Sequence, residues 1–181
     1  MQLSEAIQLI QSDKLSRSTP SEWADLGCGS GLFSYALSHF LKSGSRLYAV
    51  DKVNPIKPEI QPNGVELIPV QQDFVTDPLN LQNLDGILMA NALHYVKNKP
   101  VLIERLKASL KPDGLFLLVE YDTDRPVPTW VPYPIRFSAL TPLFQSAGYG
   151  SVQKLAERPS RYGTGSMYAA LISPDATPGI I

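Results

Sequence analysis

The chain has 181 residues, of which 44% are hydrophobic and 18% charged, and its formal net charge is -1. These values fit one globular domain with an ordinary core, and they disfavour both disorder and electrostatic binding to nucleic acid. The single cysteine, Cys28, excludes an internal disulfide and a cysteine-rich zinc site. With no apolar run long enough for a membrane span and no pattern of a secretory signal, we expect a soluble, cytoplasmic protein that binds no membrane.

The first half of the chain predicts a strand, helix, strand unit after a short N-terminal helix. Apolar residues at helical spacing, Leu3, Ile7 and Ile10, predict that first helix within residues 1–19, the rest of which reads as a linker. A strand at Glu22–Leu26 and a helix at Leu32–Leu41 should follow. Further strands are expected at Arg46–Asp51 and Val65–Val70, the latter near a sheet edge because Pro69 donates no backbone hydrogen bond.

The second half continues the alternation of strands and helices. The expected elements are a strand at Leu84–Ala90, a helix at Pro100–Leu110, a strand at Gly114–Glu120, a helix at Ser138–Ala147, and two closing strands at Ser151–Leu155 and Met167–Ile172. The tail, residues 174–181, is expected to be frayed. This order predicts an α/β fold with a doubly wound, mostly parallel, seven-stranded sheet, helices on both faces and a C-terminal antiparallel hairpin. Ligands of such sheets bind beyond the carboxyl ends of the strands.

A glycine-rich turn follows the first predicted strand, in the segment Asp25-Leu26-Gly27-Cys28-Gly29-Ser30-Gly31. Glycines at alternate positions let a ligand approach the backbone, and the next helix offers free N–H groups. Asp51 ends the next strand, 20 residues after Gly31, where a carboxylate can accept ribose hydroxyls. The spacing differs from the G-x-G-x-x-G of dinucleotide sites, which opposes a nicotinamide cofactor.

The pattern resembles motif I of the class I (Rossmann-like) S-adenosylmethionine-dependent methyltransferases, and the resemblance covers nearly the whole chain. Besides the glycine turn and Asp51, it includes Gln72-Asp73-Phe74, Asn91-Ala92-Leu93-His94-Tyr95 and the turn before the fifth strand, Leu110-Lys111-Pro112-Asp113-Gly114-Leu115. It implies S-adenosylmethionine as the cofactor. The residues that it implies for cofactor binding are Asp25, Gly27, Cys28, Gly29, Gly31, Asp51, Lys52, Asp73, Phe74 and Asn91.

The resemblance also implies individual roles for some of these residues. Asp25 would lie near the methionine ammonium and Asp51 on the ribose hydroxyls. Asp73 would lie at the adenine amino group, with a solvated loop carboxylate as its alternative. Phe74 would lie nearby, with simple core packing as its alternative. Lys52 would cover the adenine with its stem, with a solvated lysine as the alternative.

Acceptor residues are expected in the loops after the fourth and fifth strands. His94 and Asp122 are the candidate catalytic residues. For His94 a structural or substrate-positioning role is preferred to that of a general base, and for Asp122 a turn-forming or solvated aspartate is the alternative. Tyr121, Trp130 and Tyr133 are candidate substrate contacts. The last two lie in the proline-rich segment 125–137, which we interpret as a substrate lid, with a packing interface as the alternative.

Two further groups of residues have weaker support as functional sites. Cys28 lies at a helix start, where thiols can be reactive, but a bound cofactor would fill the space beside it. Arg158, Arg161 and Tyr162 are candidates for binding an anionic group, although a solvated loop is the commoner arrangement. No metal site is expected.

The sequence therefore predicts a methyltransferase that acts on a small or medium-sized acceptor. The alternatives are a catalytically silent S-adenosylmethionine-binding subunit that supports a partner and, with less support, an NAD(P)-dependent oxidoreductase. A second copy of the chain or a protein partner is a candidate for completing the acceptor site.

Overall fold

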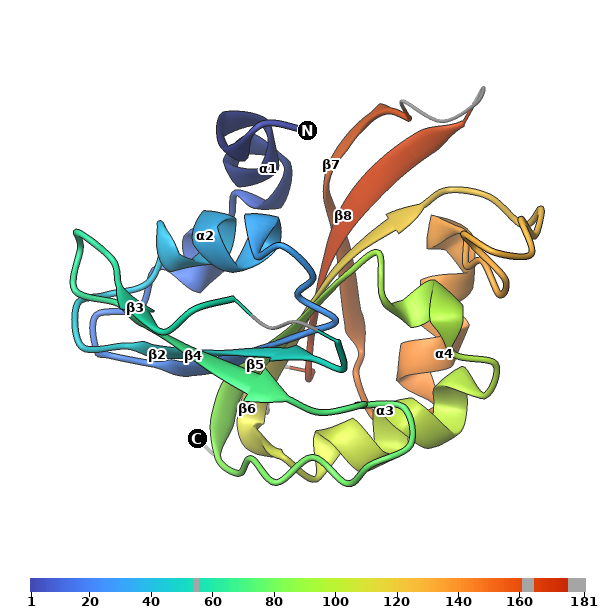
Figure 1. The fold of residues 1–181 in the computed structure, drawn as a ribbon. Coiled ribbons are helices and arrows are strands. Elements are labelled where there is room, and N and C mark those ends of the chain that lie inside the picture. The colour runs from blue at the N-terminus through green and yellow to red at the C-terminus, as the bar shows by residue number, and fades with distance from the viewer. Residues whose placement is uncertain (54–55, 161–164, 176–181) are drawn as a thin grey trace.

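The computed structural model describes residues 1–53, 56–160 and 165–175. These residues form one eight-stranded sheet with helices on both of its faces (Figure 1). The strands are β1 (Glu22–Leu26), β2 (Arg46–Asp51), β3 (Glu59–Ile60), β4 (Glu66–Gln71), β5 (Leu84–Ala90), β6 (Leu110–Tyr121), β7 (Ser151–Pro159) and β8 (Ser166–Ser173). The helices are α1 (Leu3–Ile10), α2 (Leu32–Ser38), α3 (Lys99–Lys107) and α4 (Leu140–Gln145), with 3-10 turns η1 (Asp13–Leu15), η2 (Leu93–Tyr95) and η3 (Phe137–Ala139).

The strand order is β3-β4-β2-β1-β5-β6-β8-β7. The five strands from β4 to β6 in this order are parallel, while β8 is antiparallel to both β6 and β7. The predicted doubly wound sheet with a C-terminal antiparallel hairpin is therefore confirmed. The sheet has eight strands instead of the predicted seven, because the short strand β3 was not expected. β3 pairs with only the first two residues of β4, so Pro69 lies beyond that pairing and close to the sheet edge, as expected.

Several element boundaries differ from the sequence-based expectations. The strand β6 begins at Leu110, not at Gly114, because Leu110 pairs with Leu84 before a register shift in the ladder. The helix α2 ends at Ser38 instead of Leu41, and α4 is preceded by η3. The strand β7 continues to Pro159 because it pairs along the whole of β8.

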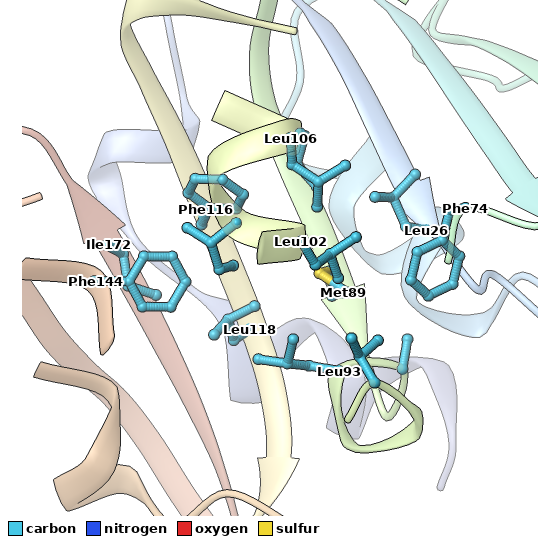
Figure 2. Packing of buried hydrophobic residues seen from close by; sticks show 14 of the residues in the cluster. Leu26, Phe74, Met89, Leu93, Leu102, Leu106, Phe116, Leu118, Phe144 and Ile172 are labelled. Atoms are coloured by element: carbon cyan, nitrogen blue, oxygen red, sulfur yellow. The ribbon is translucent and has the colours of Figure 1, made fainter. Parts of the chain in front are cut away.

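The hydrophobic core lies in two layers, one on each side of the sheet. One layer packs α3 and α4 against the central strands, and Figure 2 shows Leu102, Leu106 and Phe144 of these helices facing Phe116 and Leu118 of β6. The other layer packs α1 and α2 against the opposite face, with α1 also contacting β7 and β8. Apolar residues of β5 and β6 contribute to both layers, which explains their near-continuous apolar sequence.

The sheet places the site where strand order reverses. β1 lies between β2 and β5. The chain passes from β1 to β2 on one side of β1 and later returns to place β5 on its other side. The carboxyl ends of these parallel strands share one edge of the sheet, and this edge collects the loops that carry the predicted functional residues. Among the described residues, no helix is long and apolar enough to cross a membrane.

Candidate functional site

The glycine turn is tied to the end of the neighbouring strand. The backbone N–H groups of Gly27 and Cys28 both donate to the Val50 carbonyl, at 2.8 and 3.1 Å. Gly27, Gly29 and Gly31 have positive φ angles of 77, 52 and 82°, a region that side chains with a Cβ rarely adopt. The turn therefore needs glycine for its backbone path at all three alternate positions.

The space around the three glycines differs, and this difference shows where the turn is open. A Cβ atom at Gly27 would lie 2.9 Å from Cβ of Ala92, so the turn is in close contact with the loop after β5. A Cβ at Gly31 would lie 2.6 Å from Cγ2 of Ile56. A Cβ at Gly29 would meet no heavy atom within 4 Å. The backbone at Gly29 is therefore the part of the turn that a ligand can approach.

Asp25 is a buried carboxylic acid with one unpaired oxygen. Its side chain is 1% exposed, and Ser34 Oγ donates to Oδ2 at 2.6 Å, whereas Oδ1 has no hydrogen-bond partner. Burial raises the pKa of Asp25 to about 7, the Ser34 hydrogen bond lowers it, and the nearby Asp51 charge raises it further. A buried acceptor without a partner favours a ligand that brings a donor or a positive charge.

Asp51 is held in place by two backbone donors. Its Oδ2 accepts from the Gly29 N–H at 2.9 Å and its Oδ1 accepts from the Val53 N–H at 2.9 Å. A carboxylate offers about four lone-pair positions, so two such bonds orient the group and leave acceptor capacity. Asp51 and the open backbone at Gly29 are thus joined directly.

Asp73, Phe74 and Lys52 lie in the loops after β4 and β2. Asp73 Oδ1 accepts from the Val75 N–H at 2.9 Å, so its carboxylate stabilises its own turn. Phe74 is 8% exposed and belongs to the core layer of Figure 2, and its ring lies beside Gly27. Its carbonyl accepts from the guanidinium of Arg105. The side chain of Lys52 is exposed. The cofactor roles of all three stay predictions.

Asn91 begins the loop after β5 in a strained conformation. Its φ angle is 54°, and its N–H donates to the Val119 carbonyl at 2.8 Å. Its side-chain Oδ1 is buried without a hydrogen-bond partner. Asn91 and Asp25 therefore present two unpaired buried oxygens at the carboxyl ends of the adjacent strands β5 and β1.

A pocket of about 900 Å³ lies over the loops after β5 and β6. Its walls include Asn91, His94, Tyr121, Asp122, Arg125 and Trp130. A smaller cavity of about 180 Å³ shares Asn91 and Tyr121 with it and extends toward Leu32 and Arg158. Asp25, Gly29 and Asp51 do not line the large pocket, so Asn91 and Ala92 form the link between the two parts of the site.

His94 and Glu120 form a buried pair at the pocket wall. They are 2% and 1% exposed, and Nδ1 of His94 lies 2.6 Å from Oε2 of Glu120. The His94 N–H donates to Oε1 of the same carboxylate at 3.1 Å. Both carboxylate oxygens of Glu120 thus hold a single residue, which fixes the orientation of the imidazole.

Asp122 lines the pocket but is engaged in holding the chain. Its Oδ1 accepts from the Phe137 N–H at 2.9 Å, and its Oδ2 lies 3.8 Å from Nζ of Lys154. These contacts close the loop that starts after β6. The geometry favours His94 over Asp122 as a base, and a catalytic role for either residue stays a prediction.

The proline-rich segment 125–137 divides into an exposed tip and an anchored half. The tip is a small turn closed by Val127 and Val131, with Trp130 at the pocket wall and 72% exposed. In the anchored half, the Tyr133 N–H donates to the His94 carbonyl at 2.9 Å, and Lys99 Nζ donates to the Tyr133 carbonyl at 2.7 Å. The ring of Tyr133 lies 5.9 Å from Lys99 Nζ, and Tyr133 does not line the pocket. The structure thus separates Tyr133 from Tyr121 and Trp130.

The remaining sequence candidates are also placed by the structure. Burial raises the pKa of the Cys28 thiol to about 12, and the charges of Asp25 and Asp51 add to the effect, which opposes a nucleophilic thiolate. Arg158 forms an ion pair with Glu5 at 2.8 Å, while Arg161 and Tyr162 lie outside the described residues. No cluster of three or more metal-ligating side chains is present within residues 1–53, 56–160 and 165–175.

Sequence reasoning did not assign a role to Ser34 or Glu120. Ser34 is the hydrogen-bond donor to Asp25, nine residues away, and its signal is a small hydroxyl residue at the buried start of α2. Glu120 is a charged residue at the end of a buried apolar strand, and that contrast is the signal that could have identified it.

The comparison with protein families gives one match. Residues 3–154 match the family model described as a methyltransferase domain. No curated protein matches the chain by sequence.

Solved structures with the same fold include several methyltransferases. The 1,6-didemethyltoxoflavin-N1-methyltransferase of Burkholderia thailandensis, solved with 1,6-didemethyltoxoflavin and S-adenosylhomocysteine, gives a TM-score of 0.68 at 21% identity over 96% of this chain and 78% of that chain. An S-adenosylmethionine-dependent methyltransferase of Methanosarcina mazei gives 0.67 at 16% identity over 88% and 94%. Human N-acetylserotonin methyltransferase, solved with S-adenosylmethionine, gives 0.62 at 18% identity over 95% and 51%. At these identities the similarity shows the fold.

Proposed function

The chain belongs to the methyltransferase domain family, and from this premise we propose that it transfers the methyl group of S-adenosylmethionine to a small or medium-sized acceptor. The observation that carries the proposal is the meeting of two features at one edge of the sheet. One is the glycine turn, open at Gly29, with the carboxyl groups of Asp25 and Asp51 beside it. The other is the adjoining pocket of about 900 Å³.

The polar groups of the turn suit the chemistry of this cofactor. Asp25 Oδ1 and Asn91 Oδ1 are buried acceptors without partners, which an ammonium group can satisfy. Asp51 keeps acceptor capacity for a pair of ribose hydroxyls. The Gly29 backbone leaves room for a ligand chain to pass closely. We assign Asp25, Gly27, Gly29, Asp51 and Asn91 to the binding of the cofactor.

Catalysis on this proposal is chiefly a matter of position. S-adenosylmethionine supplies a methyl group already activated on a sulfonium centre. The protein then has to hold the acceptor atom at about 3 to 3.5 Å from that carbon and exclude water. The pocket walls at Tyr121 and Trp130 would position the acceptor, and His94 would accept a proton where the acceptor carries one.

Methyl transfer from a labelled cofactor tests this function directly. We expect that the protein, incubated with trideuteromethyl S-adenosylmethionine and a metabolite extract, forms at least one product that mass spectrometry shows to carry the label. The Asp51→Ala variant should form less of it when the cofactor is limiting. Tight binding of S-adenosylhomocysteine with no labelled product from a broad set of extracts would contradict the proposal and support a catalytically silent subunit instead.

A further inference from the structure

The pocket walls carry an arrangement that selects among methyl acceptors. We propose that the acceptor is a flat aromatic compound with an ionisable hydroxyl group, and that His94, held by Glu120, takes the hydroxyl proton as the oxygen is methylated. This inference rests on the proposed methyl transfer and adds to it the chemical class of the acceptor. Two observations on the pocket and one chemical argument support it.

The first observation is the concentration of aromatic rings around the pocket. His94, Tyr95, Tyr121 and Trp130 all line it, and the His94 ring centroid lies 4.4 Å from that of Tyr95 and 6.2 Å from that of Tyr121. Tyr95 and Trp130 are nonetheless 49% and 72% exposed. Large exposed aromatic side chains on a concave wall indicate a surface that a planar ligand covers, because stacking removes their apolar faces from water.

The second observation is the pair of contacts that hold His94 against Glu120. Glu120 accepts from the His94 main-chain N–H with Oε1 and faces Nδ1 with Oε2 at 2.6 Å. With Glu120 ionised, Nδ1 is the donor in this contact, and Nε2 is then the ring nitrogen with a lone pair. The buried carboxylate also stabilises the positive charge that the ring acquires when it takes a proton. His94 is therefore prepared as a base, with Glu120 as its positioning residue.

The chemical argument concerns which acceptors need such a base. A carboxylate acceptor has no proton to lose, and a neutral amine can lose its proton to water after transfer. An aliphatic hydroxyl is too weakly acidic for an imidazole to assist effectively, whereas an aromatic hydroxyl lies within its range. A thiol also lies within this range, but the aromatic walls of the pocket favour an aryl hydroxyl.

The proposed step balances without a further reagent. The hydroxyl proton moves to Nε2 of His94, and an oxygen lone pair forms the new bond to the methyl carbon. The bond between that carbon and the sulfonium sulfur breaks, and its electron pair stays on sulfur. The products are an aryl methyl ether, S-adenosylhomocysteine and a protonated His94, which returns its proton to water.

The test uses the protein loaded with S-adenosylhomocysteine and 4-nitrophenol as the probe, because the phenol and phenolate forms absorb at different wavelengths. At a pH where most free probe is neutral, we expect binding to the wild-type protein to produce the phenolate band. His94→Gln should reduce that band at least tenfold, and Glu120→Gln should reduce it while the probe still binds. The matched control is His39→Gln, the only other histidine, which should behave as the wild type.

Melting temperature and S-adenosylhomocysteine affinity, measured for each variant, identify any variant that fails to fold. For the wild-type protein alone, the label from trideuteromethyl S-adenosylmethionine should appear on an aromatic oxygen in an extract. Neutral bound probe, no saturable probe binding, or label on nitrogen, sulfur or aliphatic oxygen would overturn the acceptor class and leave methyl transfer standing. Failure of S-adenosylhomocysteine to bind would overturn the proposed function itself.

Discussion

Burial of Asp25 links the stability of the protein to pH. Its pKa of about 7 lies above the ordinary aspartate value of 3.8, chiefly because burial disfavours the charged form. In the ligand-free protein the folded state therefore binds more protons than the unfolded state between these values. The stability associated with Asp25 is highest below its unfolded pKa and falls as the pH rises through the folded value.

The raised pKa of Asp25 predicts that the protein loses stability as the pH rises. Raising the pH from 5 to 8 should lower the stability of the ligand-free wild type, by at most on the order of 1 kcal/mol per pH unit from this residue. Asp25→Asn, which keeps the acceptor for Ser34, should lose this contribution. Urea unfolding of both proteins across the pH range measures the difference. Identical pH dependence in the two proteins would show that Asp25 does not titrate as described.

Asp51 gives a second prediction at the residue scale. Asp51→Ala should weaken cofactor binding by roughly 1.5 to 3 kcal/mol, the scale of lost hydrogen bonds to a charged group, and should leave the fold intact. Asp51 ends β2 at the open edge and is not part of the core layers. Calorimetry with S-adenosylhomocysteine measures the loss, and Glu104→Ala, an exposed carboxylate on α3, is the control. Unchanged affinity in Asp51→Ala would remove its ribose role.

At the scale of elements, substitutions in the glycine turn should affect stability and ligand binding to different extents. Gly29→Ala should cost about 1 to 2 kcal/mol of stability through its positive φ, because its Cβ would meet no neighbour. The same methyl group would occupy the open side of the turn and should weaken S-adenosylhomocysteine binding about ten- to hundredfold, the usual cost of overpacking. Gly27→Ala should be less stable than Gly29→Ala because its Cβ would also crowd Ala92.

A matched control for the turn is available in the same chain. Gly44 has a φ of 86°, and a Cβ there would meet only Pro20 at 3.4 Å. Gly44→Ala should therefore lose a similar amount of stability with normal cofactor affinity. Equal affinity losses in Gly29→Ala and Gly44→Ala would mean that the turn is not the binding element.

The segment 125–137 supports a prediction about dynamics. Its exposed tip, residues 125–130, should exchange amide hydrogens faster than β5 and β6, whereas the Tyr133 and Phe137 amides, held by His94 and Asp122, should exchange slowly. Trp130→Ala should change cofactor affinity by less than about 0.5 kcal/mol and should lower turnover or raise the acceptor KM. Uniformly slow exchange, or loss of the fold in Trp130→Ala, would identify the tip as core packing.

Elements with a strong local signal could be predicted from the sequence, and contacts between distant residues could not. The apolar run at Leu84–Ala90 gives β5 with its bounds unchanged. Lys111 to Gly114 read as a turn, but pairing of Leu110 with Leu84 extends β6 through them. The partners His94 and Glu120 are 26 residues apart, and the position of Tyr133 against Lys99 depends on packing of the loop after β6 against the start of α3. Such contacts follow from tertiary structure, which local patterns do not encode.

For the whole molecule, one sheet edge brings the glycine turn and the pocket together, and the family match spans residues 3–154. It stays a prediction that the chain folds as a single domain and that it lies in the cytoplasm. It also stays a prediction that a second copy or another protein completes the acceptor site. We expect the glycine turn to bind S-adenosylmethionine and not a dinucleotide.

Ligand-induced thermal stabilisation tests that claim most directly, because a ligand that binds only the native state raises its melting temperature by mass action. We predict that S-adenosylmethionine and S-adenosylhomocysteine raise the melting temperature of the wild-type protein and raise it less in Asp51→Ala. NAD and NADP at the same concentrations should have no effect. A larger increase with either dinucleotide than with S-adenosylhomocysteine would contradict the account.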